Sequence, residues 1–320
     1  MNATSDTDAR HRLAPGQVSR RDFLGSLTAA TAALTLGTPG LAGAAQPSAP
    51  LKWPIVAFSK AFQELTFDEA ADLAAEVGWN GLECPVRKGG HVESERVEED
   101  LPKMVEALKK RGLAMHLLTS DIQSMATPHA EKVLRTAARL GIRHYRLGMF
   151  RYAPDKPIPA QVAEVRAGLR DVVALTKELG MSAGIQNHSG ADNLGAPVWD
   201  IYEIIKELDP RHLGVHFDIG HATVEGGNAW KINSRLLEPF LKSVYVKDFT
   251  WQKGPKGWAN KWCPLGEGMI SRGFVAGLKK TAFDGPISQH FEYPISTGAE
   301  RVQLLQKDLA TLKAWLGGAA

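Results

Sequence analysis

Residues 212–221 have the sequence HLGVHFDIGH, in which an apolar segment ends in the polar pair His216 and Asp218. Successive side chains of a strand point to opposite faces, so two residues spaced i, i+2 share one face. Further apolar segments end in the same way, with the pairs Gln186 and His188, Tyr245 and Lys247, and His290 and Glu292. In a closed parallel barrel such pairs meet at the mouth, at the carboxyl ends of the strands.

The rest of the chain repeats a unit in which an amphipathic helix ends in glycine and a short strand follows. The glycines are Gly78, Gly112, Gly141 and Gly180. Glycine just past a helix end adopts the left-handed conformation that satisfies the last carbonyls. Thr66 with Glu69 predicts a capping box, and Thr127 before Pro128 predicts another helix start.

The predicted strands cover 54–58, 80–83, 113–118, 143–148, 181–186, 212–218, 242–247 and 286–292. Their alternation with helices predicts a single-domain (β/α)8 TIM barrel over residues 53–320. An open doubly wound sheet is the alternative, but no glycine-rich phosphate turn follows the first strand. Residues 249–268 are rich in tryptophan and glycine, which indicates an insertion before the last strand.

The first 44 residues predict a cleavable twin-arginine signal peptide, and residues 45–52 predict a linker. Ser19–Leu24 carries the twin-arginine pattern, a weakly apolar stretch follows, and Ala42–Ala44 offers a small-residue cleavage site. We therefore expect the twin-arginine export machinery as a partner and a periplasmic or secreted location. A disordered tail is the alternative, and Pro39 interrupts the stretch before it reaches the length of a transmembrane helix.

Composition excludes other classes of protein. The 320 residues carry a net charge of +3, with 44% hydrophobic and 23% charged residues, as in an ordinary globular protein. Basic residues are interspersed with acidic ones, which argues against a nucleic-acid-binding surface. The two cysteines, Cys84 and Cys263, are either separate thiols or one disulfide.

The polar residues at the strand ends indicate acid–base chemistry. Asp218 and His221 lie within one turn and suit a divalent ion such as Mn²⁺, Mg²⁺, Co²⁺ or Zn²⁺, or Asp218 caps the next helix. Lys247 is suited to hold a substrate oxygen or a developing enolate, or it neutralises a nearby carboxylate. His290 and Glu292 share one face, where neighbouring titratable groups separate their pKa values.

Further residues are candidates for substrate contact. Glu83 follows the second predicted strand and is a ligand, a base or a structural ion-pair partner. His188 contacts a metal or the substrate, or is an ordinary loop histidine. Trp251 and Trp258, with Trp262, either cover the apolar face of a sugar ring or pack the insertion onto the barrel.

From about Trp53 onward the chain resembles the xylose isomerase-like TIM barrels, the sugar phosphate isomerase/epimerase group. The matching motifs are Gly78–Glu83, Asn187–His188, Asp218–His221, Val246–Asp248 and Gly285–Ser288. The resemblance implies one divalent metal, held by a Glu, an Asp, a His and a Glu, and proton movement between adjacent sugar carbons. By position these ligands fall on Gln186, Asp218, Tyr245 and His290, so that only the aspartate is retained.

We therefore expect an exported, divalent-metal-dependent enzyme that abstracts a proton next to a carbonyl of a saccharide or keto-sugar, with isomerisation, epimerisation or elimination as the result. The expected metal ligands are Asp218, His290 and Gln186; Glu292 is the base, Lys247 and His221 stabilise charge, and Glu83, His188, Trp251 and Trp258 contact the substrate. The alternative is a non-catalytic periplasmic carbohydrate-binding or accessory protein on a barrel that has lost its metal.

Overall fold

The computed structural model describes residues 51–317. The predicted signal peptide, residues 1–44, and all but the last two residues of the predicted linker lie outside the described residues. Within 51–317 no helix has the length and apolar character needed to cross a membrane.

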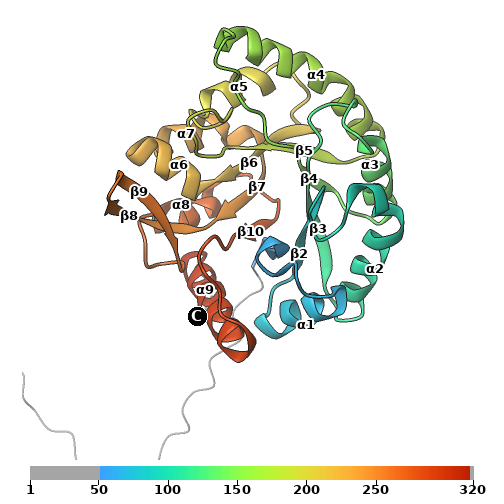
Figure 1. Ribbon diagram of the computed structural model, residues 1–320, viewed down its shortest axis with the longest axis vertical. Helices are drawn as coiled ribbons and strands as arrows, with labels where there is room; N and C mark the ends of the chain where they lie inside the picture. Colours follow the sequence, from blue (N-terminus) through green and yellow to red (C-terminus); the bar gives the residue numbers. More distant parts are fainter. Residues whose placement is uncertain (1–50, 318–320) are drawn as a thin grey trace, which may run out of the picture. The chain divides into compact units, whose positions relative to one another are not determined.

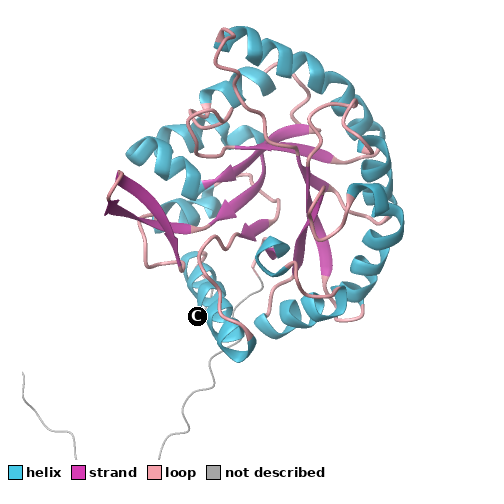
Figure 2. Cartoon of the chain, viewed as in Figure 1, coloured by secondary structure: helices cyan, strands magenta, loops and turns pink. Residues whose placement is uncertain are grey.

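Eight parallel strands close into a barrel in the order β1-β10-β7-β6-β5-β4-β3-β2 (Figures 1 and 2). They are β1 (Ile55–Phe58), β2 (Gly81–Val86), β3 (Ala114–Ser120), β4 (His144–Arg146), β5 (Ser182–Gln186), β6 (Leu213–Asp218), β7 (Leu241–Val246) and β10 (Ile287–Gln289). Each predicted strand is present, and the predicted TIM barrel is confirmed.

Helices surround the barrel (Figure 1). They are α1 (Phe67–Val77), α2 (Val97–Lys109), α3 (Ala130–Arg139), α4 (Ile158–Glu178), α5 (Trp199–Ile205), α6 (Ile219–Gly226), α7 (Trp230–Leu237), α8 (Arg272–Gly277) and α9 (Gly298–Trp315). Short 3-10 helices lie at η1 (Ser59–Phe62), η2 (Ser94–Arg96), η3 (Gly227–Ala229), η4 (Glu238–Phe240) and η5 (Leu278–Lys280).

The predicted helix boundaries are confirmed at most positions. The predicted helix-ending glycines have positive φ angles: Gly78 at 92°, Gly112 at 70°, Gly141 at 82° and Gly180 at 62°. The capping box of Thr66 and Glu69 is present. The prediction at Thr127 was wrong, because α3 begins after His129 and the Thr127 hydroxyl instead accepts the backbone N–H of Gln123 at 3.1 Å.

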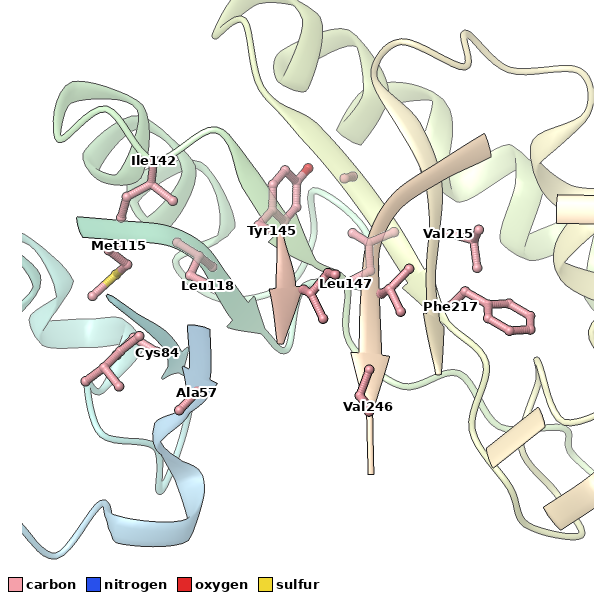
Figure 3. Close-up of a cluster of buried hydrophobic side chains, with 14 of the residues drawn as sticks. Ala57, Cys84, Met115, Leu118, Ile142, Tyr145, Leu147, Val215, Phe217 and Val246 are labelled. Atoms are coloured by element: carbon pink, nitrogen blue, oxygen red, sulfur yellow. The ribbon is translucent and has the colours of Figure 1, made fainter. Parts of the chain in front are cut away.

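The strand faces divide the residues between two environments. Outward-facing side chains such as Leu118, Tyr145, Phe217 and Val246 form the apolar core between barrel and helices (Figure 3). Inward-facing positions are largely polar and buried, which is unusual because a buried polar group must find partners inside the protein. The barrel therefore places a polar network directly beneath its mouth. Cys84 and Cys263 are unpaired thiols.

The predicted insertion forms an antiparallel hairpin, β8 (Asp248–Gly254) and β9 (Gly257–Cys263), which lies beside the barrel (Figure 1). Asp248 anchors both ends of the segment. Its carboxylate accepts backbone N–H groups of Phe249 at 2.9 Å and of Gly266, Gly268 and Ile270 at 3.0 Å. A Cβ at Gly268 would lie 2.2 Å from Asp248 Oδ1, so only glycine allows this approach.

We expect Asp248→Asn to lower the free energy of unfolding by about 2–4 kcal/mol, since the amide nitrogen would face donors that now bind a buried carboxylate. Urea denaturation followed by circular dichroism measures the change. Asp155→Asn, at an exposed position, is the control and should stay within about 0.5 kcal/mol of wild type. Equal stability of the two variants would contradict this anchoring role.

Candidate active site

A buried polar layer crosses the barrel below its mouth, centred on Glu83 of β2, which is fully buried. Its carboxylate accepts hydrogen bonds from Tyr245 Oη at 2.9 Å and Ser288 Oγ at 2.6 Å. His290 Nε2 donates to it at 3.1 Å, and the Thr119 hydroxyl also donates. The layer therefore joins side chains from β2, β3, β7 and β10 and the residue that follows β10.

The charge of Glu83 is set by these partners. Burial alone would raise its pKa, but His290 and the hydroxyl donors outweigh burial and hold the pKa of Glu83 at about 2. Because Tyr245 donates to Glu83, its oxygen accepts from His216 Nδ1, 2.8 Å away. Burial lowers the pKa of His216 to about 3, so this imidazole is neutral. The ionised Glu83 thus fixes the Tyr245 and His290 side chains in position.

Lys247, directly after β7, lies at the centre of a cluster at the mouth and is only 4% exposed. Its Nζ is 3.2 Å from Asp218 Oδ2 and donates to His221 Nε2 at 2.7 Å. It also lies 4.7 Å from the ring centroid of Trp262, within the range of a cation–π contact. The ammonium is therefore held on three sides by an anion, an imidazole and an indole.

The ring of His221 is a neutral acceptor in this cluster. Burial, followed by the charge of Lys247, places the pKa of His221 well below its ordinary value. Because Nε2 accepts from Lys247, Nδ1 carries the proton and donates to Ser189 Oγ at 2.7 Å. The ring of His188 lies 3.8 Å away, centroid to centroid. The predicted residues His188 and His221 are therefore together at the mouth.

Glu292 is the mouth carboxylate that solvent reaches, with 27% of its side chain exposed. Its Oε1 lies 3.7 Å from Lys247 Nζ, and its Oε2 accepts from Lys60 at 3.5 Å. Burial raises the pKa of Glu292, but Lys247, Lys60 and His290 outweigh that effect, and its pKa is lower than usual. Glu292 is consequently ionised near neutral pH and able to accept a proton.

Gln186, predicted as a metal ligand, is engaged on both sides. Its Oε1 accepts a hydrogen bond from the Arg146 guanidinium, and its Nε2 donates to Asp218 Oδ2 at 2.8 Å. Arginine only donates and carboxylate only accepts, so the amide cannot turn around without losing both bonds. The oxygen that would bind a metal is therefore directed at a permanent cation.

The other positions expected to hold a metal are occupied as well. Asp218 bonds to Gln186, Lys247 and the backbone of His221, whereas His290 Nε2 donates to Glu83. Over residues 51–317 no group of three or more His, Cys, Asp or Glu side chains could hold a metal ion. The residues as placed do not fit a divalent metal. The side-chain cations of Arg146 and Lys247 already bind the oxygens of Gln186 and Asp218 that a metal would use.

The four predicted substrate contacts fall at different places. His188 lies at the mouth, but Glu83 is fully buried with its carboxylate bonded within the barrel, which does not support direct substrate contact. Trp258 is 67% exposed and pairs with Lys253 near the hairpin turn, and Trp251 is 39% exposed. The tryptophan beside Lys247 is instead Trp262.

Residues that the sequence-based prediction missed complete the mouth. Arg146 ends β4 and is 5% exposed, yet its guanidinium reaches Gln186 on β5 and lies 6.0 Å from the ring of Phe58 on β1. Phe58 in turn stacks on His290 at 4.7 Å between ring centroids. The available signal was an arginine inside a predicted buried strand, which requires a partner in the barrel.

Comparison with known proteins agrees with this fold. A model of the family described as xylose isomerase-like TIM barrel matches residues 71–315. A curated relative, an uncharacterized protein of Methanocaldococcus jannaschii, is 28% identical over 124 residues, which cover 38% of this chain and 40% of that protein. The match thus spans less than half of that relative.

Three solved structures are similar along most of their length. A 3-keto-D-glucoside 4-epimerase from E. coli has a TM-score of 0.64 at 15% identity, covering 82% of this chain and 99% of that chain. A probable 3-DHS dehydratase from Bacillus anthracis has 0.62 at 15%, covering 82% and 98%. A xylose isomerase-like TIM barrel protein from Mycobacterium smegmatis, in complex with magnesium, has 0.61 at 14%, covering 82% and 98%. At these identities the likeness establishes the fold.

Proposed function

The chain belongs to the family of xylose isomerase-like TIM barrels, and on this premise we propose that it is a sugar isomerase/epimerase-like enzyme that abstracts a proton next to a carbonyl. Structures of the same fold that include an epimerase and a dehydratase support the proposal. The substrate class is a saccharide or keto-sugar, and the outcome is isomerisation, epimerisation or elimination.

One observation carries the proposal: the ionised, partly exposed Glu292 lies 3.7 Å from the buried ammonium of Lys247 at the mouth. A base beside a fixed cation is the pair that enolate formation needs, since the base accepts the carbon-bound proton and the cation stabilises the oxygen that becomes negative. Asp218 and His221 hold Lys247 in this position.

The reaction follows from this pair. Glu292 accepts the proton from the carbon next to the carbonyl, and the electron pair of that C–H bond forms the double bond of an enediolate. Lys247 donates a hydrogen bond to the former carbonyl oxygen, which now carries the negative charge. Isomerisation is complete when the hydroxyl proton of the deprotonated carbon passes to the former carbonyl oxygen and Glu292 returns its proton to the former carbonyl carbon. Epimerisation requires that water deliver a proton to the opposite face of the original carbon, after which Glu292 releases its own proton to solvent. In an elimination the β-substituent leaves with its bonding electrons and takes a proton from solvent.

We expect the protein to exchange the carbon-bound hydrogen next to a carbonyl with solvent. The experiment incubates a panel of ketoses, 3-keto-glucosides and uronates with protein in D₂O and follows the loss of the C–H signal by proton NMR. Exchange should occur with at least one member of the panel and should stop in Glu292→Gln, because deuterium enters through the base. Exchange that is equally fast in that variant would contradict the assignment.

A non-catalytic carbohydrate-binding protein is the second candidate function. The arrangement that favours it is the bond from Arg146 to Gln186, which engages the oxygen expected to bind a metal. Saturable sugar binding without deuterium exchange on any member of the panel would support this candidate against the enzyme.

We also propose that residues 1–44 direct twin-arginine export to the periplasm or beyond. The motif that supports this, Ser19–Leu24, lies outside the described residues. Replacement of Arg20 and Arg21 by lysine should retain the protein in the cytoplasmic fraction, and unchanged fractionation would contradict export by this route.

A further inference from the structure

Lys247 occupies the position of a bound cation. Its Nζ lies 2.7 Å from a neutral imidazole nitrogen of His221, 3.2 Å from Asp218 Oδ2 and 3.7 Å from Glu292 Oε1. One nitrogen and two carboxylate oxygens around a centre are the donors a divalent ion would use. Here the protein's own ammonium fills that centre, and a metal would have to displace a buried ion pair.

Arg146 adds a second fixed cation that retains bonding capacity. Its guanidinium donates to Gln186 Oε1, but its buried Nε has no hydrogen-bond partner in the part of the chain that the structure describes. An unpaired buried donor is costly, and most such groups in proteins have a partner. The guanidinium fork suits a planar pair of anionic oxygens.

The two cations lie on the same network. Gln186 bonds to Arg146 through its oxygen and to Asp218 through its nitrogen, and Asp218 pairs with Lys247. A second guanidinium, that of Arg87, lies 6.0 Å from the ring of Phe58, the same distance as that of Arg146. The mouth thus holds the basic side chains of Arg146 and Lys247 alongside the carboxylates of Asp218 and Glu292.

We propose that Arg146 and Lys247 form a fixed cationic site that binds a planar pair of anionic oxygens, such as an enediolate or a carboxylate of the substrate, and that this site works without a divalent metal. The inference rests on the proposed function for its ligand class. The two cations supply the electrostatic stabilisation of developing negative charge, which is usually the largest contribution to this kind of catalysis.

The first experiment measures metal and anion binding separately from activity. Elemental analysis of the purified protein should find no stoichiometric Mn, Co or Zn, and titration with Mn²⁺ or Mg²⁺ alone should give no heat of binding. Oxalate, a planar anion that resembles an enediolate, should bind to protein that has been treated with chelator and then desalted. Isothermal titration calorimetry measures its affinity.

The second experiment tests whether Arg146 and Lys247 form the site that binds oxalate. Arg146→Met and Lys247→Met should each weaken oxalate binding about 10- to 100-fold, because each removes charge-assisted hydrogen bonds. Arg146→Lys keeps the charge and tests the site if Arg146→Met unfolds. Arg146→Lys should lose less affinity for oxalate than Arg146→Met does. Arg170→Met and Lys253→Met, at exposed positions outside the mouth, are matched controls and should bind oxalate as wild type does.

D-Glucuronate, a sugar acid, distinguishes the two possible ligands of the site, a carboxylate of the sugar and an enediolate. If the site also receives a carboxylate of the sugar, D-glucuronate should bind and should weaken in Arg146→Met, whereas neutral D-glucose should show no dependence on Arg146. If only the enediolate is held, D-glucuronate and D-glucose should behave alike and oxalate alone should depend on Arg146. Both results support the cationic site.

A tightly held divalent metal, oxalate binding that requires added metal, or no oxalate binding in metal-free protein would each overturn the inference. These outcomes are independent of the proposed function. Metal-free oxalate binding without turnover would support the cationic site while the enzyme proposal fails. A sugar-converting protein that needs Mn²⁺ would keep the enzyme proposal and overturn the cationic site.

Discussion

Glu292→Gln is expected to reduce kcat/KM about 10²- to 10⁴-fold on any substrate that the exchange screen identifies, as loss of a positioned base does. The glutamine has nearly the same shape and can still accept from Lys60, so the fold should remain. Its amide cannot accept the carbon-bound proton. Steady-state kinetics measures the loss, and circular dichroism with thermal unfolding checks the fold.

Glu300→Gln is the matched control for Glu292→Gln, because it removes an exposed carboxylate in the first turn of α9. It should leave kcat/KM unchanged. Turnover of Glu292→Gln at the wild-type rate would remove Glu292 from the base role.

The pH dependence of kcat/KM for the same reaction should follow the ionisation of Glu292. The base must be deprotonated, and the pKa of Glu292 is below its ordinary value because Lys247, Lys60 and His290 outweigh burial. The acidic limb of kcat/KM should therefore lie below the usual carboxyl range. Lys247→Met removes the largest of these cationic effects and should move the limb to higher pH. An unmoved limb would show that another group titrates.

The sequence was sufficient to predict the barrel, because most of the predicted helix ends have a local cause. Glycine with positive φ at Gly78, Gly112, Gly141 and Gly180 and the capping box at Thr66 act within a few residues. The i, i+2 pairs placed Asp218, Lys247 and Glu292 near the same mouth. The distances of 3.2 Å and 3.7 Å from Lys247 Nζ fulfil that expectation of proximity.

The depth of a side chain within the barrel was not predictable in the same way. The second strand was expected to end at Glu83, but β2 continues to Val86. Glu83 therefore lies in the middle of a strand, and its side chain is fully buried inside the barrel, where it bonds to Tyr245 and Ser288. An error of three residues in where the strand ends therefore changes the role predicted for Glu83.

Contacts that depend on how strands pair could not be predicted from the sequence either. The hairpin register pairs Phe249 with Trp262 and places Trp258 opposite Lys253. This register brings Trp262, rather than the other two tryptophans, to Lys247. In the same way, Gln186 alone resembles a weak metal ligand, and only the reach of Arg146 from the neighbouring strand shows that its oxygen is engaged.

Glu83→Gln is expected to lower the free energy of unfolding by about 3–5 kcal/mol at pH 7, since it removes the anion from a buried charged network. Every neighbour of the carboxylate, including Ser288 and His290, donates a hydrogen bond to it. A glutamine presents one acceptor and one amide group to these donors. Urea denaturation measures the loss.

The loss of stability in Glu83→Gln should decrease as the pH falls, because folding lowers the pKa of Glu83. The pKa of Glu83 is about 2 in the folded protein against 4.5 ordinarily. The contribution of ionised Glu83 to the free energy of unfolding is therefore complete above the ordinary pKa. It is lost as the pH falls through the pKa of the folded protein. The stability difference between wild type and variant should narrow from pH 5 downward. Glu238→Gln, at an exposed position, should show neither effect, and a pH-independent difference for Glu83→Gln would mean that its shape, not its charge, stabilises the barrel.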